Sequence, residues 1–149
     1  MTSIPAVLAA LTTLGIATLP NSQVINGPRT TVTTTDDRLL IVGEEVTSGQ
    51  RALDSMAIGT TSEQYTVSLA VSADVPGTDQ TAADAQALAD YAAMELAIRE
   101  YPGGPNLGLG AQGVLSVLPT GAFELKRIAS ADGRHAAVKW SIAVYAQNT

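Results

Sequence analysis

The start of the chain predicts a short helix that packs on the core. Ser3 can cap a helix whose first turn accepts Pro5, and the helix ends between Gly15 and Pro20. The residues that we expect to face inward are Leu8, Ala9, Leu11 and Ile16.

Two strands and a long excursion follow this helix. The segment SQVING at 22–27 reads as a strand, and a Thr-rich connection at 27–37 leads to a second strand, RLLIVG at 38–43. Because the second strand has no polar face, we expect it in the middle of a sheet. The segment 44–59 shows no sustained period and contains two glycines, so we predict a long loop with a short helical turn at 51–56.

The rest of the chain predicts one more strand, a second helix and a three-stranded meander. Apolar and polar residues alternate from 64 to 74, as in a strand with one face in the core. Thr81 and Asp84 resemble a capping box at the start of an Ala-rich helix that ends near Glu100. The turn signals PTGA and ADGR separate the last three predicted strands, at 111–119, 121–130 and 134–147. We therefore expect a single α+β domain over 1–149, a mainly antiparallel twisted sheet with two helices packed on one face.

The second helix carries two apolar stripes on roughly opposite sides. One stripe contains Ala85, Leu88, Ala89, Ala92 and Leu96. The other contains Ala83, Ala87, Tyr91, Met94, Ile98 and Tyr101. A helix on a sheet needs one stripe only, so the second stripe requires another surface, either the first helix or a neighbouring subunit.

Composition also points to a surface that a partner covers. Charged residues make up 15% of the chain, whereas about 25% is usual for a soluble domain. The net charge of −6 and the few aromatic residues argue against nucleic-acid binding. Residues 1–100 hold twelve acidic and four basic side chains, and residues 101–149 hold two acidic and four basic ones. The acidic surface of one copy could therefore meet the basic surface of the next, although a solvated surface explains the asymmetry about as well.

No catalytic or metal-binding pattern is present in the sequence. The chain has no cysteine and a single histidine, His135, which follows a hairpin turn and reads as a solvated turn residue. The apolar N-terminal run lacks the basic flank of a signal peptide and is too short to span a bilayer. We therefore expect no enzymatic activity, no cofactor, no metal and no membrane partner.

Candidate interface residues come from the helix and from outward strand positions. Arg51, Arg127 and Lys139 could form ion pairs between subunits. Ala87, Met94 and Ile98 belong to the second helical stripe, and Tyr91 and Tyr145 are aromatic residues of the kind that anchors interfaces. Trp140 is expected to fill the core rather than an interface.

The chain resembles the tail terminator, or head-to-tail joining, proteins of long-tailed bacteriophages. The resemblance covers nearly the whole chain. It is carried by an N-terminal helix ending near LPNSQVINGP, the strand DDRLLIVG, a long polar strand, an Ala-rich helix and the closing strands GAFELKRIAS and AAVKWSIAVYAQ. It implies a subunit that forms a homohexameric ring with its own copies, caps the tail tube, ends tube polymerisation and joins the tail to the head connector or stopper. The implied place is the head-proximal end of the virion tail, after assembly in the host cytoplasm, with DNA passing through a negative lumen without sequence-specific binding.

Other functions fit the same sequence. Another neck or tail-tube protein of the virion would differ from a terminator mainly in the partner that it contacts. A small-molecule-binding α+β domain would place its site beside the excursion at 44–59 and the Gly-rich loop PGGPNLGLG at 102–110.

Overall fold

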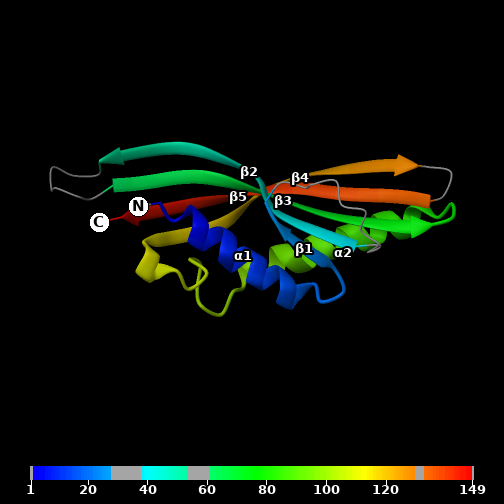
Figure 1. Ribbon diagram of the computed structural model, residues 1–149, viewed down its shortest axis with the longest axis horizontal. Helices are drawn as coiled ribbons and strands as arrows, with labels where there is room; N and C mark the ends of the chain where they lie inside the picture. Colours follow the sequence, from blue (N-terminus) through cyan, green and yellow to red (C-terminus); the bar gives the residue numbers. More distant parts are fainter. Residues whose placement is uncertain (1, 28–37, 54–60, 130–132, 149) are drawn as a thin grey trace.

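The chain folds as a two-layer α+β domain, which confirms the expected fold class (Figure 1). The computed structural model describes residues 2–27, 38–53, 61–129 and 133–148. It does not describe the side chains of 48–53, 61 and 148. Helix α1 (Ile4–Thr18) and helix α2 (Gln80–Arg99) cover one face of a five-stranded sheet, and the opposite face carries no described helix.

The sheet has the strand order β1-β2-β3-β5-β4. The strands are β1 (Gln23–Asn26), β2 (Arg38–Leu53), β3 (Thr61–Pro76), β4 (Val114–Ala129) and β5 (Gly133–Asn148). β1 runs parallel to β2, and every other neighbouring pair is antiparallel. A single turn of 3₁₀ helix at Gly110–Gln112 precedes β4.

Two predictions about the strands were wrong. Residues 44–53, expected in a loop, continue β2, so Arg51 lies in a strand and not in a helical turn. Residues 54–60 of the same prediction lie outside the described residues. The PTGA signal does not reverse the chain, because Pro119 and Phe123 both pair with β5 and belong to one strand, β4. The expected meander is therefore one long hairpin of β4 and β5.

The core lies between the helices and the sheet. The alternating residues of β3 and β5 face it as predicted, and Trp140 is 3% exposed. From α1, the core receives Val7, Leu11 and Gly15, whereas Ala9 and Ile16, which were expected to face inward, are exposed. A Cβ atom at Gly15 would overlap the Leu40 side chain, so the glycine allows α1 to lie close to β2.

Helix α2 packs on the sheet through the second of its two predicted stripes. Ala83, Ala87, Met94 and Ile98 are buried, and a buried Asp90 lies among them. The N-cap is Asp79, whose side chain accepts a hydrogen bond from the Ala82 amide at 3.0 Å, so the capping box expected at Thr81 does not form.

An ion pair fixes α2 to the beginning of β2. The Arg38 guanidinium donates from Nε to Asp90 Oδ2 at 3.1 Å and pairs through Nη2 with Asp90 Oδ1. Gln86 Nε2 donates to the same carboxylate at 3.1 Å. The buried carboxylate is therefore neutralised and hydrogen-bonded, as a charge in an apolar layer requires.

Among the described residues, no helix is long and apolar enough to cross a membrane.

Candidate subunit interface

The sheet ends in two edges that lack a neighbouring strand among the described residues. β4 (Val114–Ala129) is the last strand at one end of the sheet. Near its start the Val117 amide donates to the Pro105 carbonyl at 2.7 Å, and beyond that point no described strand pairs with its outer side. At the other end, β1 pairs only with Leu39–Val42, so the described part of β2 from Gly43 to Leu53 is also an edge. Unpaired strand edges offer amide and carbonyl groups to another chain.

The β4 edge also carries most of the exposed apolar side chains. Seven large hydrophobic residues are exposed in the described part of the chain, and four of them are in β4: Leu115, Leu118, Phe123 and Ile128. Each is between 46% and 58% exposed. A long apolar edge strand in a free monomer promotes association, so β4 is the strongest candidate for a contact that another protein covers.

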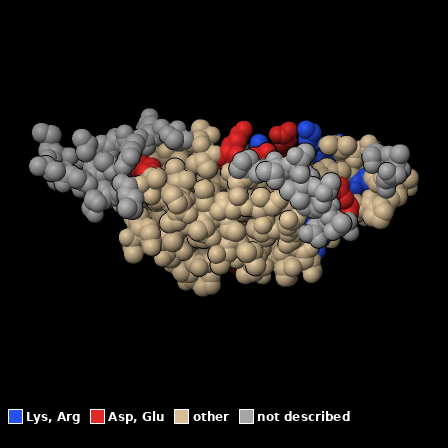
Figure 2. All heavy atoms as spheres, viewed as in Figure 1, with Lys and Arg blue, Asp and Glu red and all other residues tan. Residues whose placement is uncertain are grey.

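The helix layer provides a second surface that is poor in charge. α1 contains no charged residue, and its exposed residues include Pro5, Ala9, Thr13 and Ile16. In Figure 2 the lower side, which the helices form, is almost free of charged side chains, and the charges gather along the upper side over the strands. The stripe of α2 that remains exposed comprises Ala85, Ala89, Ala92 and Leu96.

Three of the predicted interface residues are part of the core. Ala87 and Met94 have no exposed surface and Ile98 is 1% exposed. They pack against the sheet as part of the hydrophobic core, so they are not available to another subunit. The surface that α2 offers to a partner is the opposite stripe, which the sequence had placed on the sheet.

The other predicted residues lie on or near the sheet. Tyr91 is half-buried, with its ring 4.9 Å from the ring of Phe123 and 4.8 Å from that of Trp140. Partial burial raises the pKa of Tyr91 to about 12, and the Glu95 carboxylate adds to the rise. Tyr91 therefore packs against Phe123 of β4, and its role at an interface stays a prediction.

Arg127, Lys139 and Tyr145 are exposed, but they lie in different surroundings. Arg127 Nε forms an ion pair with Asp84 of α2 at 3.0 Å, so its charge already has a partner within the subunit. Lys139 and Tyr145 lie on the open face of β5. The side chain of Arg51, the eighth candidate, lies outside the described residues.

A shallow hollow lies on the open face of the sheet. It has a volume of about 420 Å³ and a floor of small residues that includes Ala70, Ser72 and Ala137. Glu44 borders it from β2, and Lys126 borders it from β4. A hollow of this size could hold a small ligand, but its charged side chains form no hydrogen-bonded cluster among the described residues.

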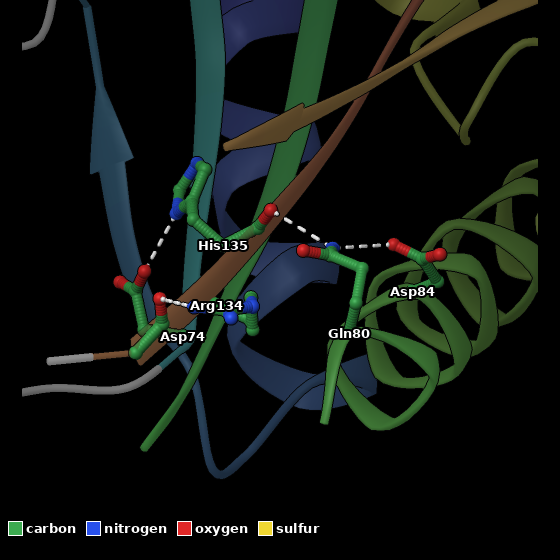
Figure 3. A network of polar contacts seen from close by, with 6 residues as sticks. Asp74, Gln80, Asp84, Arg134 and His135 are labelled. Atoms are coloured by element: carbon green, nitrogen blue, oxygen red, sulfur yellow. Dashed lines mark hydrogen bonds and ion pairs between the residues drawn. The ribbon is translucent and has the colours of Figure 1, made fainter. Parts of the chain in front are cut away.

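The single histidine joins the start of β5 to β3 and α2 (Figure 3). His135 Nδ1 lies 2.6 Å from Asp74 Oδ1. Gln80 Nε2 donates to the His135 carbonyl at 3.2 Å and to Asp84 Oδ1 at 2.8 Å. His135 is therefore not the solvated turn residue that the sequence predicted, because the register of β3 and β5 places Asp74 directly opposite it. These contacts connect the first turn of α2 to the sheet.

Comparison with protein-family models and with curated proteins gives no match for this chain. Among the described residues, no group of His, Asp or Glu side chains is arranged to hold a metal ion.

Proposed function

We propose that this chain is a structural subunit that joins its own copies through the edges of its sheet and forms a ring. The observation that carries the proposal is β4, which is an edge of the described sheet and carries four of the seven exposed large hydrophobic side chains of the described residues. Pairing this edge with a strand of another copy removes apolar surface from water and satisfies the open amides and carbonyls.

The directions of the strands favour a head-to-tail contact. β2 and β4 run in opposite directions, because three antiparallel pairings separate them. When a second copy lies beside the first in the same orientation, β4 of one meets β2 of the next as an antiparallel pair. Such a contact joins unlike surfaces, so repeating it produces a closed ring or an open filament.

The sequence resemblance supports a place for the proposed ring. We propose that a homohexamer caps the tail tube of a long-tailed bacteriophage, ends its polymerisation and joins the tail to the head-side connector, without enzymatic activity. The uncharged helix α1 supports this role, because a ring that joins a tube to a connector needs broad contact surfaces besides those between its own subunits.

The first test is the native mass of the purified protein by light scattering across a concentration series, with electron microscopy of the largest species. We expect hexameric rings. A tube-like polymer would assign the chain to the tail tube instead. A monomer at every concentration, with no binding to preformed tubes, would contradict the proposal and favour the small-molecule alternative.

A matched pair of variants tests the β4 edge. Leu118→Lys places a charge on β4, whereas Leu96→Lys places the same charge at a similarly exposed position on α2. We expect the first variant to remain monomeric and the second to form rings. Thermal unfolding checks that both variants keep the fold.

A further inference from the structure

Both sheet edges carry exposed charged residues that form no ion pair among the described residues. Glu44 and Glu45 are exposed on β2, and β4 carries one exposed carboxylate, Glu124, beside the exposed Lys126. No ion pair connects any of the four to a described residue. The four ion pairs found in the described part of the chain are Arg38 with Asp90, Arg99 with Glu95, Arg127 with Asp84 and His135 with Asp74.

The acidic pair is presented by an irregularity in β2. Val42 pairs with Leu69 and Val46 pairs with Val67, so the segment 43–45 bulges opposite the single residue Ser68. The Glu45 amide donates to Ser68 Oγ at 2.8 Å, which fixes the backbone of the bulge. Bulges bend an edge strand and redirect its side chains, and this one holds two adjacent carboxylates at an open edge.

We propose that the acidic bulge at Glu44 and Glu45 of one copy binds Lys126 on β4 of the next copy. This inference rests on the proposed ring and identifies the contact that gives the ring its direction. A two-fold contact between two β2 edges brings the carboxylates of Glu44 and Glu45 from both copies together, whereas a head-to-tail contact brings them beside Lys126. Burial of the exposed hydrophobic residues of β4 stabilises the contact, and the charges favour the β2 edge as its partner.

The contact also predicts how neighbouring subunits are offset. Within one sheet, Lys126 shares a row with Ala137, Ser72 and Leu39. For Lys126 to lie beside the bulge, the next copy must be shifted along the strand direction, so that Lys126 lies near Glu44 of that copy and not near Leu39. Strands that close into a ring are tilted and staggered in this way.

Charge reversals test the proposal. We expect Lys126→Glu, or Glu45→Lys, to raise the concentration at which rings dissociate by on the order of tenfold at low salt, and the combined Glu45→Lys/Lys126→Glu variant to recover most of the loss. The matched control is Lys139→Glu, which changes the same charge on the same face but in β5, one strand inside the edge. Equal effects of Lys126→Glu and Lys139→Glu, or no recovery in the combined variant, would overturn the proposal.

Cysteine cross-linking tests the pairing of unlike edges directly, because the chain has no native cysteine. Copies with Glu45→Cys are mixed with copies with Lys126→Cys and oxidised in the assembled state. We expect disulfide dimers that contain one copy of each kind. Dimers of identical copies only, or no dimers from intact rings, would overturn the contact but leave the ring in place. A wild-type chain that forms no assembly would contradict both the contact and the proposed function.

Discussion

Ser68 of β3 lies directly opposite Ser141 of β5, and the edge strand on each side of this pair bulges at the same row of the sheet. The segment 43–45 of β2 opposes Ser68, and the segment 120–122 of β4 opposes Ser141. In Figure 1 the long strands converge near the middle of the sheet and diverge on both sides. Bulges bend the strands that contain them, so β2 and β4 are both expected to bend at this row.

The first prediction concerns the hydrogen bond that holds the β2 bulge. Ser68→Ala removes the oxygen that accepts from the Glu45 amide, and we expect it to lower the free energy of unfolding by about 1 kcal/mol. Hydrogen exchange of the Glu45 amide should become faster. Ser72→Ala, on the same face of β3, is the control and should leave this amide unchanged. An unchanged exchange rate in Ser68→Ala would show that the serine does not hold the bulge.

The buried ion pair between α2 and β2 leads to the second prediction. Asp90→Ala leaves the Arg38 guanidinium without its carboxylate, and we expect a loss of about 2–3 kcal/mol in urea unfolding. Glu95→Ala is the control because it breaks the exposed pair with Arg99, and it should cost no more than about 0.5 kcal/mol. Similar losses in both variants would contradict the importance of burial.

The third prediction compares the two stripes of α2. Ala87→Glu places a carboxylate in a position with no exposed surface, and we expect a loss of at least about 3 kcal/mol, enough to unfold much of the protein. Ala89→Glu makes the same change on the exposed stripe and should leave the thermal midpoint within a few degrees of wild type. The assembly state of Ala89→Glu then reports on contacts of the helix layer. A folded Ala87→Glu protein would contradict the orientation of the helix.

Alkaline pH provides the fourth prediction. Burial raises the pKa of Tyr65, whose hydroxyl lies 2.8 Å from Ser3 Oγ, to about 12, whereas a tyrosine in an unfolded chain has a pKa near 10. The fold therefore favours the neutral phenol. This contribution to stability is fully present below about pH 10 and is lost as the pH rises through about 12.

Tyr65→Phe should reduce the slope with which the free energy of unfolding falls at alkaline pH. Urea unfolding at a series of pH values measures this slope. The wild-type protein and the variant are compared by their slopes, because the variant also loses the hydrogen bond to Ser3 at every pH. Tyr91, whose pKa is also raised to about 12, keeps part of the slope in the variant. Identical slopes in the two proteins would show that Tyr65 does not titrate with unfolding.

The two helices, the central strands and the fold class could be predicted from local patterns in the sequence. The alternation from Tyr65 to Ala73 and in β5 survives in the structure because each of these strands has one face on the core and one facing outward. The Ala-rich helix was also visible, since it lies between a polar N-terminus and a PGGP stop. These features depend on local propensity and on a simple period, which a single chain displays without its partners.

The ends of the strands and the surfaces that remain open depend on long-range pairing, which local patterns do not show. Bulges at 43–45 and 120–122 interrupt the period of two, so the first was predicted as a loop and the second as a turn, although pairing with β3 and β5 continues past both. Both stripes of α2 are rich in alanine, and packing on the sheet selected the one with Met94 and Ile98. The candidate interface could not be predicted from the sequence for the same reason. A strand becomes an edge through long-range pairing with the rest of the sheet, and no local pattern records which strand is left without a neighbour.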